Sequence, residues 1–160
     1  MAIYASRCVL LATLLFCLAL SGCLQNDNPV PLEENERGPN SVIVTIDFGI
    51  HTNLSSSSLI PSNSTITNIT FDPVLVSNGT NAYRVMEEIQ IREAFTMDVT
   101  FYSFGPFITA IDGVSQNTTF FWILYENEIG SCVGANELLI ESDTSLMWKL
   151  QSDYPECPLA

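Results

Sequence analysis

The stretch Thr80-Asn-Ala-Tyr-Arg-Val-Met-Glu-Glu-Ile-Gln-Ile-Arg92 decides the fold, because it carries the clearest helical pattern beyond the N-terminal apolar run. Its apolar side chains recur at the i, i+3, i+4 and i+7 positions of an amphipathic helix. They are Ala82, Val85, Met86 and Ile89. We therefore expect one helix over residues 80–92, entered from the turn Asn78-Gly79-Thr80, with Glu87, Glu88 and Arg92 on its solvent side.

Strand patterns lie on both sides of this helix. Before it, residues 42–48 alternate, with Val42, Val44, Ile46 and Phe48 on one face, and residues 67–76 form an edge strand because Pro73 cannot donate a ladder hydrogen bond. After it, the pattern predicts strands at residues 99–104, 107–111, 120–125, 137–140 and 145–150. Gly105-Pro106 is a predicted break and Asp112-Gly113 a predicted turn. This order is typical of an α+β domain, and a β-grasp-like mixed sheet wrapped around one helix fits it best.

The N-terminus predicts export. One positive charge, Arg7, precedes an apolar run over residues 8–20 that is too short to span a membrane as a mature helix, as in a secretory signal. The next residues, Leu20-Ser21-Gly22-Cys23, resemble the lipobox of prokaryotic lipoproteins, in which the chain is cut before the cysteine and its thiol receives lipid. The alternative is an uncleaved anchor in which Cys23 is one more apolar residue. In either case the domain lies on the extracytoplasmic face of the cell membrane.

Three segments follow from this interpretation. Residues 1–22 form a lipoprotein signal peptide. Residues 23–40 are rich in Gln, Asn, Asp, Pro, Glu and Gly, with little to bury, so we expect a disordered tether. Residues 41–160 form the folded domain, a length typical of one domain.

The charge balance excludes one class of partner. After removal of residues 1–22, four cations face all 18 acidic residues, which gives a net charge of −14. Such a surface repels phosphate backbones, so we expect no nucleic-acid binding. The acidity suits either a salty medium or simple solubility.

Two cysteines remain once Cys23 is lipidated and the signal is removed. In an oxidising compartment Cys132 and Cys157 most simply form one disulfide. A metal site would need more ligands than these cysteines and the single histidine, His51, supply. The sequons at Asn53, Asn63, Asn68, Asn78 and Asn117 indicate either glycosylation or merely polar loops.

Two blocks in the C-terminal half carry a family resemblance. The Ala110-Ile-Asp-Gly-Val114 and Phe121-Trp-Ile-Leu-Tyr-Glu-Asn127 blocks, with the flanking residues 102–109, Val133-Gly134-Ala135 and 143–148, resemble the domain shared with the C-terminal part of gastric intrinsic factor and transcobalamin. The resemblance implies a β-grasp-like ligand-binding domain, which in the vitamin carriers forms one wall of the cobalamin site. The sequence departs from that pattern at Asn127-Glu128, where Asn-Gly is usual, and at Ser142-Asp143, where Gly-Asp is usual. It also shows no counterpart of the carriers' helical barrel.

The aromatic side chains of these blocks are the candidate binding residues. Alternate members must fill the core, and the others can stack against a flat apolar ligand. We select Phe104, Phe107, Trp122 and Tyr125.

Catalysis is not indicated. The single imidazole, His51, lies in a Ser/Asn/Thr-rich loop, and a lone loop histidine is far more often solvated than catalytic. Asp112 and Asp143 could act as a carboxylate pair, but they stand beside turns, where such residues are usually structural. We expect a non-enzymatic surface lipoprotein that binds cobalamin or another planar molecule, with no cofactor of its own. The alternative is an interaction module that docks on a larger envelope protein through a sheet edge.

Overall fold

The computed structural model describes residues 28–49, 57–61 and 64–156. The predictions for the signal peptide, Cys23, His51, Asn53, Asn63 and Cys157 lie outside these residues.

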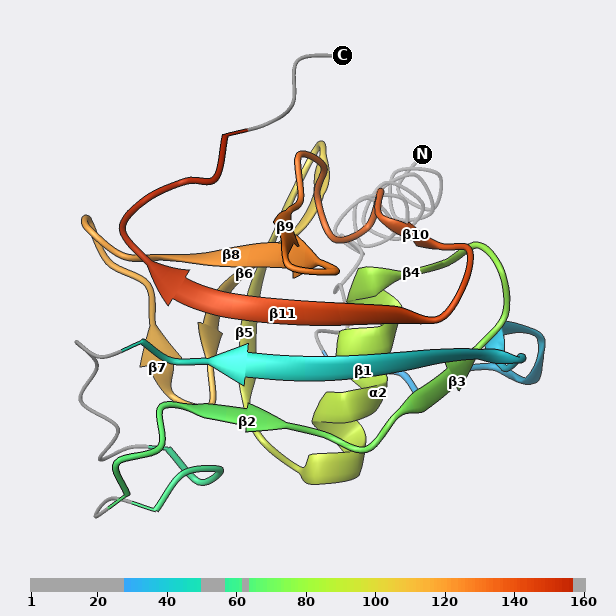
Figure 1. Ribbon diagram of the computed structural model, residues 1–160, viewed down its shortest axis with the longest axis horizontal. Coiled ribbons are helices and arrows are strands. Elements are labelled where there is room, and N and C mark those ends of the chain that lie inside the picture. The colour runs from blue at the N-terminus through green and yellow to red at the C-terminus, as the bar shows by residue number, and fades with distance from the viewer. Residues whose placement is uncertain (1–27, 50–56, 62–63, 157–160) are drawn as a thin grey trace, which may run out of the picture.

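The main sheet is built on two long central strands that run parallel (Figure 1). β1 (Asn40–Asp47) pairs with β11 (Thr144–Gln151) from Val42 opposite Thr144 to Asp47 opposite Lys149. β8 (Phe121–Glu126) and then β9 (Ile129–Gly130) continue the sheet antiparallel beyond β11. On the other side of β1 lie β2 (Asn68–Thr70) and β3 (Val74–Val76). The edge position predicted for residues 67–76 is correct, but these residues form two short strands, because Pro73 cannot donate a ladder hydrogen bond.

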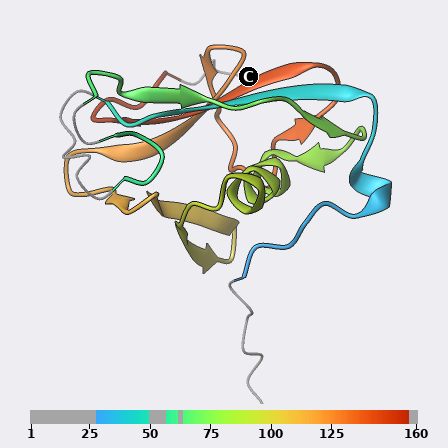
Figure 2. The same ribbon diagram turned by 90° about the horizontal axis from the view of Figure 1, so that it is seen from below.

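The helix α2 (Ala82–Glu93) lies against one face of this sheet (Figure 2). Asn81 caps it by accepting a hydrogen bond from the Arg84 amide at 2.9 Å, and Ala94 ends it in the left-handed conformation. The predicted stripe of four apolar side chains is fully buried, as are Val42, Val44, Ile46 and Phe48 of the facing sheet. The amphipathic patterns of helix and strand therefore meet in one core.

Two smaller sheets complete the fold. β5 (Met97–Tyr102), β6 (Gly105–Ile111) and β7 (Val114–Ser115) form an antiparallel sheet, and β4 (Thr80–Asn81) pairs with β10 (Leu139–Ile140). The domain is α+β with one α-helix in its described residues, as predicted, but its strands form three sheets. The predicted break at Gly105-Pro106 is wrong, because the turn falls at Ser103-Phe104 and Tyr102 pairs with Gly105.

The prediction of a disordered tether is wrong for residues 28–40, the part of it that the structure describes. Leu32 is buried in the core, η1 (Glu34–Glu36) is a short 3-10 helix, and residues 30–37 pack along α2. We call residues 30–37 the N-terminal strap. The sequence shows one apolar anchor among polar residues, so its composition resembled a solvated linker.

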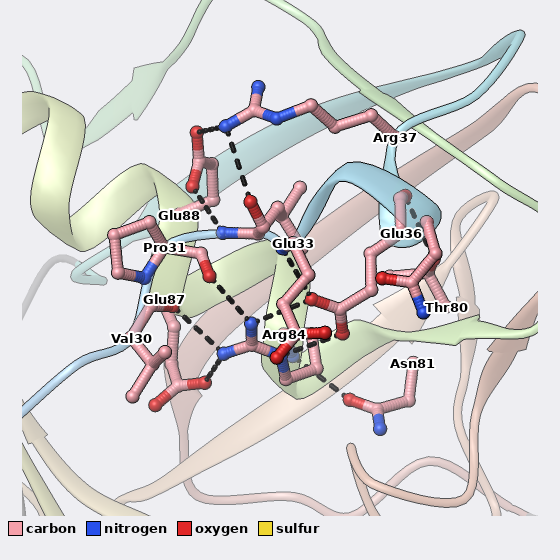
Figure 3. Close-up of polar contacts among 12 residues, drawn as sticks. Val30, Pro31, Glu33, Glu36, Arg37, Thr80, Asn81, Arg84, Glu87 and Glu88 are labelled. Atoms are coloured by element: carbon pink, nitrogen blue, oxygen red, sulfur yellow. Dashed lines mark hydrogen bonds and ion pairs between the residues drawn. The ribbon is translucent and has the colours of Figure 1, made fainter.

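Arg84 on α2 holds the strap in place (Figure 3). Its guanidinium donates two hydrogen bonds to Glu36, at 2.9 and 2.8 Å, one to Glu87, and one each to the carbonyls of Val30 and Pro31, at 2.8 and 2.9 Å. These five bonds match the five N–H donors of the side chain. Glu87 is therefore buried against Arg84, and its predicted place on the solvent side is wrong because the strap covers that face of the helix.

Candidate functional site

An apolar hollow of about 190 Å³ lies at the β8 side of the main sheet. Its floor comes from β8 and β11, one wall from the β5–β6 hairpin, and the other wall from the loop after β9 and the C-terminal segment. The lining residues are Phe104, Pro106, Phe107, Ile108, Trp122, Ile123, Leu124, Ser131, Val133, Gly134, Ala135, Trp148, Tyr154 and Pro155.

The floor is rigid because its tryptophans belong to the core. Trp122 on β8 and Trp148 on β11 are both buried. The Trp122 indole N–H donates to the Val114 carbonyl at 3.1 Å, and its ring meets Phe48 edge-on at 5.6 Å between centroids. A buried indole with its N–H satisfied keeps one orientation, so the floor is preformed.

The hairpin wall carries a cluster of three aromatic rings. Tyr102 and Phe104 stack with their ring centroids 5.0 Å apart, and Phe107 meets Tyr102 edge-on at 6.2 Å. Tyr102 and Phe104 are 52% and 59% exposed, which is unusual for rings of this size. The two-residue turn at Ser103-Phe104 places the cluster at the tip of the hairpin.

The opposite wall is fixed by backbone hydrogen bonds. The Ser131 amide donates to the Leu124 carbonyl at 2.8 Å, which ties the loop to the edge of β8 that also pairs with β9. The Tyr83 amide donates to the Ala135 carbonyl at 3.0 Å. The C-terminal segment packs on the same loop so closely that a Cβ on Gly130 would lie 2.0 Å from Cγ of Pro155. Glycine is therefore required at position 130.

The hollow has no acidic or basic residue in its lining. The three segments that build most of it, residues 99–111, 113–125 and 129–136, are uncharged in a chain of net charge −13. A charged ligand would lose its hydration there without an ion-pair partner, so the site suits a neutral group.

Three of the four predicted site residues meet in this hollow, namely Phe104, Phe107 and Trp122. Tyr125 is not among the lining residues, and its hydroxyl instead accepts a hydrogen bond from Gln151 Nε2 at 2.7 Å. Sequence reasoning missed Trp148, Val133 and Tyr154. Trp148 could have been found from the sequence, because it lies on the same face of its strand as Leu146 and Leu150. Val133 and Tyr154 lie in loops, where no periodic pattern marks them.

The carboxylates considered for catalysis have separate structural partners. Asp112 accepts hydrogen bonds from Ser57 Oγ, Ser58 Oγ and the amides of Ser58 and Leu59, at 2.6 to 2.9 Å. Asp143 accepts from the Ser41 amide at 2.8 Å. Each carboxylate thus holds a neighbouring segment in place.

Two findings concern metals and membranes in residues 28–49, 57–61 and 64–156. These residues contain no group of three or more His, Cys, Asp or Glu side chains that could hold a metal ion. None of their helices is long and apolar enough to cross a membrane.

Sequence comparison identifies one family. Residues 79–152 match the family described as a domain of unknown function, DUF4430. No curated protein matches the chain.

Two solved structures are similar to this chain. Haptocorrin in complex with Cbi aligns with a TM-score of 0.50 and 21% identity, over 75% of this chain and 27% of haptocorrin. A candidate metal-binding protein from Ruminococcus gnavus ATCC 29149 aligns with a TM-score of 0.49 and 14% identity, over 72% of this chain and 99% of that protein. The resemblance to transcobalamin-type carriers is confirmed by the DUF4430 match and the fold shared with haptocorrin, and the chain spans about a quarter of haptocorrin.

Proposed function

We propose that this chain, with its DUF4430 segment and transcobalamin-like fold, is an extracytoplasmic binding lipoprotein that captures a neutral, flat, apolar group. The observation that carries the proposal is the uncharged hollow between the β5–β6 hairpin and the loop after β9. Preformed aromatic floors with few polar groups are typical of small-molecule sites. The lining has no carboxylate or imidazole that could activate the Ser131 hydroxyl as a nucleophile, which favours recognition over catalysis.

The topology supports the finer description of the fold as β-grasp-like. A parallel central pair, β1 and β11, is flanked by antiparallel strands, and one helix crosses the inner face. Haptocorrin, which is solved with Cbi bound, shares this fold.

The size of the hollow limits what it can enclose. A volume of about 190 Å³ is below the roughly 300–1,000 Å³ of pockets that bury a drug-sized ligand. It accommodates one or two fused rings, so a cobalamin-like molecule would contact the hollow with one edge and leave most of its surface uncovered. A smaller planar molecule would be covered more completely.

The proposal is tested with a neutral planar probe, N-phenyl-1-naphthylamine, followed by fluorescence. Replacing both Phe104 and Phe107 by alanine should weaken binding about tenfold, because the hairpin wall loses its stacking rings. The matched control is Phe101→Ala, which removes an exposed ring of the same hairpin outside the hollow. Equal affinity in wild type and double variant would refute the site.

Cobalamin itself is tested separately by calorimetry with the full mature chain. Heat that saturates in the wild type and weakens in the double variant would support the vitamin as ligand. No heat at high micromolar cobalamin would remove it and leave the smaller planar ligands.

Attachment to the membrane through lipid on Cys23 is part of the proposal. It rests on the Leu20-Ser21-Gly22-Cys23 motif and predicts that Cys23→Ser releases the protein from membranes. Retention of this variant would contradict the anchor.

A disulfide between Cys132 and Cys157 also remains a prediction. The packing of Pro155 on Gly130 brings the chain that leads to Cys157 close to the loop that holds Cys132. Mass mapping without reduction should show the two peptides joined, and two free thiols would refute the bridge.

Docking on an envelope protein through a sheet edge is less well supported. The exposed edge consists of β2 and β3, each three residues long and separated by Asp72-Pro73. Short, interrupted edge strands are poor templates for strand addition.

A further inference from the structure

The tip of the β5–β6 hairpin has the chemistry of a membrane-interface anchor. Residues 99–111 contain no charged side chain, and Phe101, Tyr102 and Phe104 at the tip are 39%, 52% and 59% exposed. Tyrosine, with an apolar ring and a polar hydroxyl, gathers at the headgroup level of bilayers, and phenylalanine rings beside it add apolar surface that can enter the acyl boundary. The stacking of Tyr102 on Phe104 already brings their apolar surfaces together, so they present one patch.

The path of the chain brings this hairpin close to the proposed lipid. Pro29 lines a second hollow together with Met97, Val99 and Phe101 of β5, so the N-terminal segment enters the domain beside the hairpin (Figure 2). The strap that follows is held by Arg84, which fixes this entry point on the domain. The anchor therefore leaves the folded body next to the aromatic tip.

The remaining link is short. Pro29 follows Cys23 by six residue steps, with five residues between them. Fully extended, they span at most about 20 Å. A longer tether would have let the domain turn freely, whereas this one keeps the β5 side of the domain near the headgroups.

The charges of the molecule favour the same orientation. Asp153 and Glu156 flank Tyr154, so the C-terminal wall of the hollow is acidic at its borders, while the hairpin is uncharged from Val99 to Ile111 and carries its one charge, Asp98, at the end away from the tip. A surface of net charge −14 is repelled by anionic lipid, so the side that touches a bilayer must be an uncharged one.

We infer that the aromatic tip of the β5–β6 hairpin, residues 101–107, docks into the headgroup region of the membrane and opens the apolar hollow toward the lipid. This inference rests on the proposed lipid attachment at Cys23. Docking in this way would supply the hollow with its ligand, because a neutral apolar compound concentrates in the bilayer. The hollow would take the compound from there.

The test uses the full lipidated chain on vesicles of zwitterionic phosphatidylcholine with brominated acyl chains, which quench nearby tryptophan. Tyr102→Trp places a reporter at the tip, where the native side chain is 52% exposed, and Leu75→Trp places one on β3, at the edge of the main sheet away from β8, where the native side chain is 58% exposed. Trp122 and Trp148 are buried and present in both variants, so they cancel in the comparison. If the tip docks, Tyr102→Trp should lose much more tryptophan emission on these vesicles than the wild type does. Leu75→Trp should lose no more emission than the wild type.

Flotation of the vesicles separates the two proposals. If the protein floats with lipid and the two reporters lose equal emission, the anchor stands and docking is overturned. If Cys23 carries no lipid by mass and the protein stays at the bottom, the anchor fails and the docking argument fails with it. A variant with Tyr102 and Phe104 both replaced by serine should still float with the vesicles but should lose its fixed orientation. A tryptophan placed at Ser103 reports the orientation, and in this variant the bromines should quench it less.

Discussion

Arg84 shows at the scale of one residue how the N-terminal strap becomes part of the domain. Its hydrogen bonds join Glu36 of the strap and Glu87 of α2 through one largely buried guanidinium. Two carboxylates and two carbonyls depend on this one cation. Removing it would leave these acceptors without a donor in a poorly hydrated place.

We therefore expect Arg84→Lys to lower the free energy of unfolding by about 2–4 kcal/mol, since an ammonium cannot reproduce the planar fork. Denaturant unfolding measures the change. Arg92→Lys is the matched control on the same helix, because Arg92 is more exposed and should cost less than about 1 kcal/mol. Equal losses in both variants would contradict the special role of Arg84.

Glu36 adds a pH dependence to the same contact. The hydrogen bonds from Arg84 lower the pKa of the Glu36 carboxyl, more than its partial burial raises it. A carboxyl whose pKa is lower in the folded than in the unfolded state stabilises at neutral pH and loses that stabilisation as the pH falls through its folded value.

The difference in stability between wild type and Glu36→Gln should therefore be present at pH 7 and shrink between about pH 5 and pH 2. Thermal unfolding over this range measures it. A difference that grows on acidification would show that the ionised carboxylate does not stabilise the strap.

Glu128 occupies a position that suits glycine. Asn127 and Glu128 connect β8 to β9 with φ values of 48° and 70°, as in a type I′ turn. Left-handed backbone costs a side chain such as Glu about 1 kcal/mol relative to glycine. This is the position where the sequence departs from the Asn-Gly of the resembling family.

Glu128→Gly should accordingly raise the free energy of unfolding by about 0.5–1 kcal/mol. Glu141→Gly is the control, since Glu141 also lies in a loop but has no left-handed φ, and it should be neutral or destabilising. Stabilisation by both changes would indicate that removal of negative charge is the cause.

The β6–β7 turn shows how one turn organises a distant loop at the scale of elements. Asp112 and Gly113 both have positive φ, 48° and 75°, as the Asp-Gly turn predicts. The buried Asp112 carboxylate then holds Ser57 to Leu59 through four hydrogen bonds.

Asp112→Asn should free this segment without disturbing the turn, because Asn tolerates the left-handed conformation and loses one acceptor oxygen. We expect faster hydrogen exchange at the Ser58 and Leu59 amides and a loss of about 1–3 kcal/mol. The Ala110 and Val114 amides of the flanking strands serve as the control. Unchanged exchange at Ser58 would contradict the anchoring.

The element predictions succeeded where a periodic pattern coincided with burial. The stripe of α2 and the alternation of β1 are both completely buried. The turn of the β5–β6 hairpin was predicted two residues too late in the chain. Gly105-Pro106 has the local composition of a turn, but the pairing of Tyr102 with Gly105 places the turn at Ser103-Phe104.

Charge acts at the scale of the whole molecule. With 18 acidic and five basic residues, carboxylates greatly outnumber cations and repel one another. Sodium chloride up to about 0.3 M should therefore raise the melting temperature, since screening shortens the range of this repulsion. A melting temperature that falls with salt would mean that the ion pairs of Arg84 outweigh the general repulsion.

The sequence by itself determined the class of fold. Residues 42–48 have the two-residue period of a strand and residues 80–92 the 3.6-residue period of a helix, and the two apolar faces must be buried against each other. It also indicated the aromatic character of the site, of which Phe104, Phe107 and Trp122 are part. Only the tertiary structure decided that the N-terminal strap packs on α2 and that Trp148, Val133 and Tyr154 complete the hollow. Those features depend on contacts between residues far apart in the chain, and long-range contacts leave no periodic trace in the sequence around them.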